Sequence, residues 1–293
     1  MNNIAADQQA VVVGIDGSDT ALGGARWAAE YAAGHALSLT LLHVIPRIDW
    51  HFAAEHAPAE LEAHTGDAVL ATAEAAIRSA HPDLEIRTFA VKGGVAAVLA
   101  DASQSARLLV VGTGSADHRA LGGQAARISH RALCPVLFWR APVAKRTGKP
   151  LPVVVGADES DAAARAVAEA FDIAAMLHAP LTVAHMWEIG AAVGMGDLGG
   201  QGNMDWTLLN LLETKQREQM DELVAPLAHK YRNAHVNKVF QDVGPAKGLV
   251  DLSQEAQLVV VGSHGRGRLA EAVLGSVSQN VIHHSECPVL LVH

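Results

Sequence analysis

Short runs of consecutive apolar residues recur along this chain and alternate with longer segments of helical periodicity. Four of these runs end in glycine, namely Val11–Gly14, Leu108–Gly112, Val153–Gly156 and Leu258–Gly262. The runs show no polar–apolar alternation, so they predict strands that are buried on both faces, as in a parallel sheet. Regular alternation of strands and helices predicts an α/β fold with helices on both faces of the sheet.

The chain repeats itself in order. Val11–Ser18 matches Val153–Ser160, Ala106–Gly112 matches Ala256–Gly262, and the Cys-Pro-Val-Leu at Cys134 recurs at Cys287. The offset grows along the chain, which indicates a duplication followed by insertions and deletions in loops. We expect a disordered N-terminus at 1–10, a first domain at 11–141, a basic, Pro-containing linker at 142–152 and a second domain at 153–293.

Each half is predicted to hold five strands. In the first half they are Val11–Ile15, Leu39–Val44, Ile86–Val91, Leu108–Gly112 and Val136–Trp139; in the second they are Val153–Gly156, Leu181–His185, Val236–Val243, Leu258–Gly262 and Val289–Val292. Candidate ligand-binding residues follow the first and the fourth strand. Ligands of doubly wound sheets bind where the strand order reverses, beyond the carboxyl ends of adjacent strands. Strands one and four should therefore be neighbours, which gives the order 3-2-1-4-5.

The clearest chemical signal is Leu258–Ser278, a buried strand followed by a glycine-containing loop and the start of a helix. Gly262 and Gly265 allow tight turns, and Gly275-Ser276 opens the helix with hydroxyl-bearing residues. Backbone amides at a helix N-terminus favour an anion such as phosphate, and Arg266 and Arg268 add positive charge. The alternative is a turn that binds no ligand and only connects a strand to a helix. The spacing matches neither a Walker A loop nor G-x-G-x-x-G.

The spacing G-x2-G-x9-G-S resembles the nucleotide loop of the universal stress protein family. The resemblance covers the whole chain twice, as in the tandem universal stress proteins of actinobacteria. It implies two tandem Rossmann-like domains of the adenine nucleotide alpha hydrolase-like type. The ligand it implies is ATP, together with Mg²⁺ or Mn²⁺ held mainly by the phosphates, so no protein side chain is expected to bind metal.

The resemblance assigns binding residues in both halves. The second-half set, expected to bind more strongly, is Gly156, Asp158, Met186, Val261, Gly262, Gly265, Arg266, Gly267, Gly275, Ser276, Val277 and Ser278. The weaker first-half set is Gly14, Asp16, Val44, Gly112, Gly114, Gly122 and Gly123. Main-chain atoms after the second strand, at His43-Val44 and His185-Met186, would face adenine.

Two further observations bear on these assignments. Asp16 and Asp158 precede helices, so each is either a turn-forming or capping residue or a carboxylate that accepts hydrogen bonds from the nucleoside. The two halves also differ, because Gly122-Gly123-Gln124-Ala125 stands where the second half has Gly275-Ser276-Val277-Ser278. The first half lacks both hydroxyls, and we expect its nucleotide binding to be weaker or absent.

Composition narrows the class of protein. A formal net charge of −9 argues against a nucleic-acid or anionic-membrane surface. Two cysteines in 293 residues suit a reducing cytosol, and no signal peptide or membrane-spanning run is evident, so a cytoplasmic protein is expected. No His, Cys or Asp cluster has zinc-like spacing.

The last strand of each half, at 136–139 and 289–292, would leave an apolar edge. Universal stress proteins pair these strands, which implies an intramolecular pseudo-dimer and permits a homodimer.

Three functions remain open: a nucleotide-dependent regulator in stress response, a slow ATPase, and a scaffold without nucleotide in the first domain. We favour the regulator, since no catalytic residue is evident; Glu271 is more readily explained as an exposed carboxylate at a helix start.

Overall fold

The computed structural model describes residues 9–46, 59–113, 123–141, 150–187, 206–265 and 274–293, without the side chains of 59–65, 206, 208 and 209. Several predicted features lie outside these ranges: residues 1–8, the linker at 142–149, and Gly114, Gly122, Arg266, Gly267, Arg268 and Glu271. The chain divides into two compact units, Met1–Ala141 and Pro142–His293, and each is described by itself below.

Each unit is built on five parallel strands. Unit 1 contains β1 (Val11–Gly14), β2 (Leu39–Pro46), β3 (Ile86–Gly93), β4 (Leu108–Gly112) and β5 (Val136–Trp139). Unit 2 contains β6 (Val153–Gly156), β7 (Leu181–Trp187), β8 (Val236–Asp242), β9 (Leu258–Gly262) and β10 (Val289–Val292). The strand orders are β3-β2-β1-β4-β5 and β8-β7-β6-β9-β10. The predicted order 3-2-1-4-5 is therefore confirmed in both units.

The first strand of each unit lies between the second and the fourth. Val11 pairs with Leu39 on one side and Leu108 on the other, and Val153 pairs in the same way with Leu181 and Leu258. All six of these residues are at most 2% exposed, and their burial explains the uninterrupted apolar runs.

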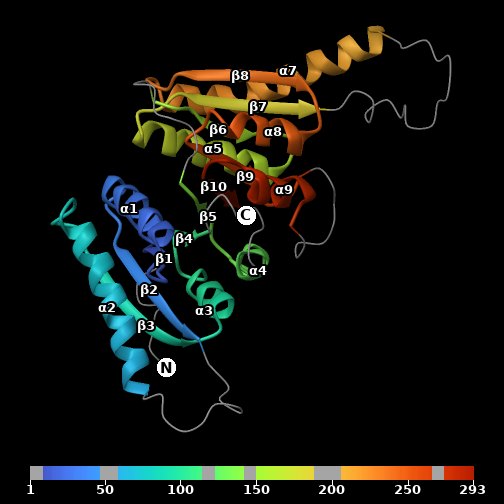
Figure 1. The fold of residues 1–293 in the computed structure, drawn as a ribbon. Helices are drawn as coiled ribbons and strands as arrows, with labels where there is room; N and C mark the ends of the chain where they lie inside the picture. Colours follow the sequence, from blue (N-terminus) through green and yellow to red (C-terminus); the bar gives the residue numbers. More distant parts are fainter. Residues whose placement is uncertain (1–8, 47–58, 114–122, 142–149, 188–205, 266–273) are drawn as a thin grey trace. The chain divides into compact units, whose positions relative to one another are not determined.

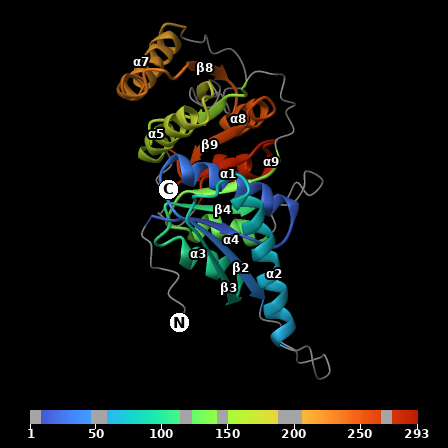
Figure 2. The ribbon, with the colours of Figure 1, turned by 90° about the vertical axis from the view of Figure 1, so that its left-hand side faces the viewer.

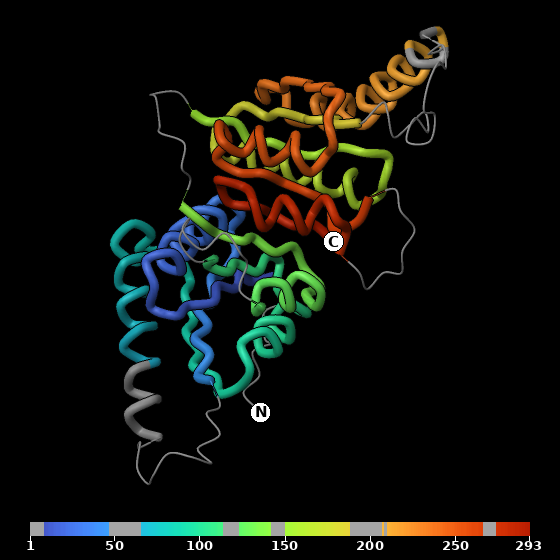
Figure 3. The backbone as a smooth tube through the Cα atoms, turned by 45° about the vertical axis from the view of Figure 1, so that its right-hand side comes forward, coloured from blue at the N-terminus to red at the C-terminus, as the bar shows by residue number. Residues whose placement is uncertain are grey.

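Helices cover both faces of each sheet (Figures 1 and 2). In unit 1, α1 (Asp19–Gly34) and α2 (Ala59–Arg78) lie on one face, and α3 (Val95–Ala102) and α4 (Gly123–Arg131) on the other. In unit 2, α5 (Asp161–Met176) and α7 (Trp206–Lys230) lie on one face, and α8 (Pro245–Ser253) and α9 (Ser276–His284) on the other. The orange part of α7 extends beyond the carboxyl end of β7 (Figures 1 and 3).

The helices that follow the first strand begin and end alike. Ser18 caps α1 by accepting a hydrogen bond from the amide of Ala21, and Ser160 caps α5 through the amide of Ala163, both at 3.1 Å. At the other end of α1, Ala36 adopts a left-handed φ of 54°. Its place in unit 2 is taken by His178, with a φ of 48°. Both are left-handed helix ends formed without glycine, at a modest cost in strain.

A buried serine ties the amino end of the last strand to the rest of each unit. In unit 2, the hydroxyl of Ser253 donates to the main-chain oxygen of Val250 and accepts from the amide of Glu286 at 3.0 Å. In unit 1, Ser103 accepts from the amide of Leu133 at 3.0 Å. The two serines are 1% exposed, so water cannot replace these bonds.

Replacing Ser253 with Ala should lower the free energy of unfolding of unit 2 by about 1–3 kcal/mol, because the buried amide of Glu286 loses its acceptor. Urea denaturation measures the change. The control is Ser79→Ala, which removes an exposed hydroxyl bonded to the main-chain oxygen of Ala76. Equal effects of the two substitutions would contradict the assignment.

Candidate functional site

The carboxyl ends of β6 and β9 bring two of the predicted segments together. These strands are neighbours, with Val155 paired to Val260, so the residues that follow them meet at one end of the sheet. The contact is close, because a Cβ atom built on Gly265 would lie 2.9 Å from Oδ2 of Asp158. The structure thus places the loop after β9 directly across from the carboxylate after β6.

The carboxylate of Asp158 has one oxygen engaged in a local turn. Its Oδ1 accepts hydrogen bonds from both the amide and the hydroxyl of Ser160, the former at 2.9 Å. This is the Asx-type turn considered for this residue. Its Oδ2 is the oxygen directed toward Gly265. The turn and a ligand-accepting role are therefore compatible, because they use different oxygens of one carboxylate.

Ser160 links the start of α5 to the loop after β9. In addition to capping α5, its hydroxyl lies within hydrogen-bond distance, at 3.3 Å, of the main-chain oxygen of His264. Asp158, Ser160 and His264 are therefore held together although more than a hundred residues separate the first two from the third. The arrangement fixes where the loop begins.

Main-chain hydrogen bonds close the base of the loop. The amide of Ser263 donates to the main-chain oxygen of Val292 at 2.7 Å, and the amide of Gly275 donates to the main-chain oxygen of Ser263 at 2.8 Å. Both ends of the loop are thereby anchored to the carboxyl ends of β9 and β10. The path between residues 266 and 273 lies outside the described residues.

Helix α9 begins at the point where the loop closes. Gly275 is its N-cap residue and supplies no side-chain hydrogen bond to the first turn. The first intrahelical acceptor is the main-chain oxygen of Gly275, which receives the amide of Gln279 at 2.9 Å. The amides of Ser276, Val277 and Ser278 therefore have no acceptor within the helix. Such amides, together with the positive end of the helix dipole, can bind an anion.

The two predicted serine hydroxyls have different surroundings. Ser276 is exposed at the first turn of α9. Ser278 is 4% exposed, and its hydroxyl donates to the main-chain oxygen of Gly262 at 2.6 Å. That proton is directed at β9, so the amide of Ser278 is the donor that this residue offers to a ligand. Its side chain instead holds α9 against the strand.

Gly262 lies where no side chain fits. A Cβ atom there would come within 2.9 Å of the carbonyl carbon of Ala162 and 3.0 Å of the amide nitrogen of Ala163, in the first turn of α5. At the end of β6, the three atoms nearest to a Cβ on Gly156 belong to the side chain of Leu249. Backbone cannot yield as a side-chain terminus does, so Gly262 is the stricter requirement of the two.

A histidine of the second strand fixes the residue before each aspartate. Nδ1 of His185 lies 2.8 Å from the main-chain oxygen of Ala157, and Nδ1 of His43 lies 2.7 Å from that of Ile15. A carbonyl oxygen only accepts, so Nδ1 carries the proton in both rings. Sequence reasoning considered only main-chain atoms here. The recurrence of histidine at matching repeat positions is the signal that could have revealed the bond.

A pair of imidazoles lies beside the start of the loop, and sequence reasoning missed it too. Nδ1 of His264 is 2.9 Å from the hydroxyl of Ser263. His293 follows β10, and its main-chain oxygen accepts from Nε of Arg165 at 2.7 Å. Burial, followed by the charges of His264 and Arg165, lowers the pKa of His293 from 6.5 to about 4. Within the described part of the chain, Nε2 of each ring is buried without a hydrogen-bond partner.

Comparison with known proteins identifies the family. The family model of the universal stress proteins matches residues 8–140 and again 151–293. The chain belongs to the universal stress protein family. A universal stress protein of Mycolicibacterium smegmatis is 32% identical over 298 residues, covering 98% of each chain. Another, from Mycobacterium tuberculosis, is 30% identical over 293 residues, covering 96% of this chain and 95% of the relative.

Solved structures agree on the fold. A universal stress protein from Archaeoglobus fulgidus superimposes with a TM-score of 0.70 at 17% identity, covering 97% of both chains. A protein from Pseudomonas aeruginosa described as a putative universal stress protein gives 0.63 at 16% identity, over 99% of this chain and 95% of the other. At these identities the likeness concerns the fold alone.

Unit 1 of this universal stress protein repeats part of the arrangement. Asp16 accepts from the amide of Ser18 at 2.9 Å and from its hydroxyl at 2.6 Å. A Cβ on Gly112 would lie 3.0 Å from the amide nitrogen of Ala21, as close as the corresponding contact of Gly262. Gly14 ends β1 as Gly156 ends β6. The frame of the site, formed by the ends of strands one and four, is therefore present in both units.

The helix that follows this frame differs between the units. Ala125 in α4 is buried where Ser278 binds β9, so unit 1 has no hydroxyl for that bond. Gly123 begins α4, and a Cβ there would have no neighbour within 4 Å. After β5, Trp139 packs against α1, where a Cβ on Gly23 would be 2.6 Å from its Nε1.

The remaining predicted residues lie on the second strands. Met186 in β7 and Val44 in β2 are 7% and 9% exposed. Each directly follows the histidine that binds the main chain before the aspartate. Their side chains are therefore mostly buried in the sheet.

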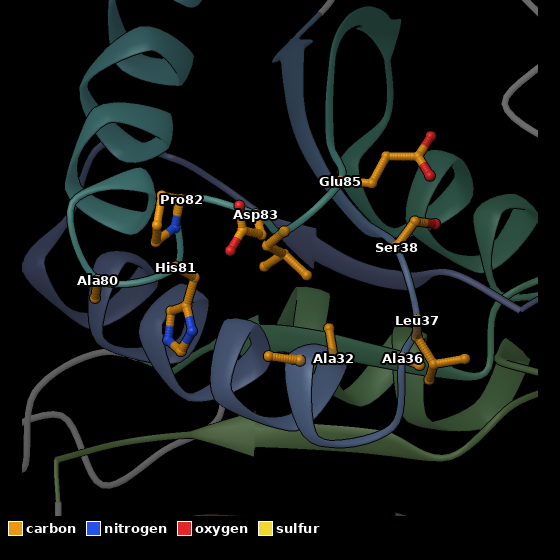
Figure 4. A pocket seen from close by; sticks show the side chains of 11 residues that line it. Ala32, Ala36, Leu37, Ser38, Ala80, His81, Pro82, Asp83 and Glu85 are labelled. Carbon is orange, nitrogen blue, oxygen red and sulfur yellow. The ribbon is translucent and has the colours of Figure 1, made fainter.

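A separate pocket of about 500 Å³ opens in unit 1 (Figure 4). Its walls include Ala32 and Ala36 of the α1 end, together with His81, Asp83 and Glu85. It lies at the amino ends of β2 and β3, the opposite end of the sheet from Gly14 and Gly112, and so is distinct from the candidate site. Glu85 is engaged by Arg87 at 2.7 Å.

The described residues offer neither a metal centre nor a membrane span. They contain no group of three or more His, Cys, Asp or Glu side chains that could hold a metal ion. None of their helices is both long and apolar enough to cross a membrane.

Gly262→Ala should destabilise unit 2 by about 1–3 kcal/mol, because the added methyl group forces β9 away from the first turn of α5. Thermal unfolding followed by circular dichroism measures the change. The control is Gly123→Ala, where the methyl group meets open space and the stability should be unchanged or slightly higher. A Gly262 variant as stable as this control would contradict the packing argument.

His293 should make stability fall in mild acid. Its folded-state pKa of about 4 is below the ordinary 6.5, so the unfolded chain binds more protons between these values. Stability is then complete above about pH 6.5 and is lost as the pH falls toward 4. His293→Gln should recover about 1–2 kcal/mol at pH 4.5, a figure reduced for partial solvent screening. Urea denaturation at pH 4.5 and 7.5 measures this, with the exposed His229→Gln as control; equal pH dependence in both variants would refute it.

Proposed function

We propose that unit 2 binds ATP in the space between Asp158 and the N-terminus of α9. The observation that carries the proposal is the loop after β9, whose closed base directs the amides of Ser276, Val277 and Ser278 toward one end of the sheet. These amides suit phosphate groups. Oδ2 of Asp158, across the loop, suits a hydroxyl or amino group of the nucleoside.

The resemblance of the loop to the family's nucleotide loop supports ATP over a simple inorganic anion. The amides of α9 would hold the phosphates, while the ends of β6 and β7 would hold the nucleoside. Mg²⁺ or Mn²⁺, when bound, would neutralise phosphate charge and take most of its ligands from the phosphates. Arg266 and Gly267 remain predicted contacts from the sequence alone.

Binding is the proposed activity, in preference to turnover. Rapid phosphoryl transfer needs a group that positions the attacking nucleophile, together with charge stabilisation. Asp158 is the carboxylate at the described part of the site, and Ser160 already engages one of its oxygens. Glu159, its neighbour, accepts a hydrogen bond from Gln216 of α7 at 3.0 Å. We therefore propose a nucleotide-dependent regulator in stress response, with slow hydrolysis as the alternative.

Unit 1 is proposed to bind nucleotide more weakly or not at all. It keeps Asp16 and the close approach of Gly112 to α1, but Ala125 replaces the serine that holds α9 in unit 2. A scaffold role for unit 1 follows if it carries no nucleotide. Pairing of the last strands, within one chain or between two, remains a prediction from the sequence.

We also propose that the protein is located in the cytoplasm, because its two cysteines are consistent with a reducing environment. Cys134 and Cys287 are both free and buried. Burial raises the pKa of the Cys134 thiol to about 12, so it stays protonated and unreactive. Both residues are best explained as small members of the core.

Gly265→Glu should weaken ATP binding at least about tenfold, since the new side chain crowds Oδ2 of Asp158 and adds negative charge beside the phosphates. Titration calorimetry with Mg²⁺-ATP measures the affinity, and circular dichroism checks the fold. Gly123→Glu, at the matching helix start of unit 1, is the control and should bind ATP nearly as well as the wild type.

The number of nucleotides per chain separates the remaining functions. Mass spectrometry of nucleotide that co-purifies with the chain should find about one ATP per chain. Two would show that unit 1 binds as well, against the proposed difference between the units. No nucleotide, together with no binding when Mg²⁺-ATP is added, would overturn the proposed function and leave the scaffold.

A further inference from the structure

Two histidines at the carboxyl ends of β9 and β10 stand apart from the residues assigned so far. The hydrogen bond from the amide of Ser263 to the main-chain oxygen of Val292 sets His293 beside the start of the loop. His264 lies at the same corner, with Nδ1 held near the hydroxyl of Ser263. Nε2 of both rings is buried, and among the described residues neither has a hydrogen-bond partner.

The carboxyl ends of β9 and β10, where His264 and His293 lie, also adjoin the N-terminus of α9. A Cβ atom built on Gly275 would lie 3.7 Å from Cα of His264 and 3.3 Å from the main-chain oxygen of Ser263. The main chain of His264 is therefore close to the start of the helix, whose first amides have no acceptor within the helix.

Burial and nearby charges both affect the protonation of His293. Burial is the largest cause of the lowered pKa of His293, and the charges of His264 from the loop and Arg165 from α5 add to it. Other titratable groups on the helices packed against β10 are Asp161, Glu169 and Asp172 of α5 and His283 and His284 of α9. An anion bound nearby would offset the charges of His264 and Arg165 that act on His293.

We propose that binding of nucleotide phosphates at the N-terminus of α9 is coupled to uptake of a proton by the His264–His293 pair. The inference rests on the proposed function of unit 2 and adds its regulation. The negative phosphates offset the charges of His264 and Arg165, which together with burial disfavour protonation of His293, so the bound state holds more protons than the free state. By linkage, the affinity for nucleotide then increases as the pH falls.

Unit 1 provides a comparison within the same chain. Arg140 follows β5 as His293 follows β10, and Thr113 stands in the place of Ser263. A guanidinium stays protonated over the whole physiological range, so Arg140 cannot couple binding to pH in this way. Transferring that arginine to unit 2, as His293→Arg, replaces a titrating group with a permanent charge.

Titration calorimetry of the full chain with Mg²⁺-ATP between pH 6.3 and pH 8.3 tests the coupling. For the wild type we expect the dissociation constant to be about fivefold smaller at pH 6.3. Measurements at pH 6.3 in two buffers of different ionisation enthalpy should show uptake of about 0.8 proton per nucleotide. Since a terminal phosphate itself titrates near pH 6, the decisive quantity is the difference between variants.

His264→Gln and His293→Gln should each remove most of the pH dependence of the affinity, and most of the proton uptake, that exceeds the contribution of the nucleotide's own phosphate. His293→Arg should bind ATP with little pH dependence, which a merely structural role of His293 would not produce. His229→Gln, an exposed substitution on α7, should behave as the wild type. Circular dichroism verifies the fold of each variant, and if one glutamine variant misfolds, the other and His293→Arg still decide.

The outcomes separate the two proposals. ATP binding by the wild type with the same pH dependence and proton uptake as the double variant His264→Gln/His293→Gln would overturn the proton coupling and leave the proposed function intact. Absence of ATP binding by the wild type at every pH would overturn both.

Discussion

The end of β9 touches the first turn of α5 so closely that no side chain fits between them. At Gly262 the neighbouring atoms are the backbone of Ala162 and Ala163, about 3 Å from where a Cβ would be. This contact sets the distance between the fourth strand and the helix after the first. It therefore brings Asp158 and the loop after β9 to the same end of the sheet. Unit 1 repeats the constraint at Gly112 against Ala21.

Around this contact, unit 2 builds its site mainly from main-chain groups. The loop is closed by two main-chain hydrogen bonds, and the candidate anion site consists of helix amides. Side chains serve to hold this frame: Ser160 connects α5 to the loop, and Ser278 connects α9 to β9. A site of this kind tolerates sequence change wherever the main-chain geometry persists, which agrees with a shared fold at 16–17% identity.

The two units show which parts of the frame can be lost separately. Both keep the aspartate turn, the serine cap and the histidine that binds the main chain before the aspartate. Unit 1 lacks the equivalent of Ser278 and carries Arg140 where unit 2 has His293. The fold needs the first group of features in either unit. The second group concerns the proposed ligand and its proposed coupling to protons, and its absence leaves the strand order of unit 1 unchanged.

The sequence by itself determined the strand order. Few arrangements agree with uninterrupted apolar runs, a twofold repeat and candidate ligand-binding residues after strands one and four. It also indicated Gly262, Gly265 and Asp158, whose roles depend on local backbone geometry and on their places after strands. The side-chain bonds of Ser278 and His185 and the His264–His293 pair were decided only by the tertiary structure. Each depends on which residues from distant segments meet at the sheet's end, and on burial that removes water. Neither the periodicity of the sequence nor the spacing of its motifs specifies these contacts or this burial.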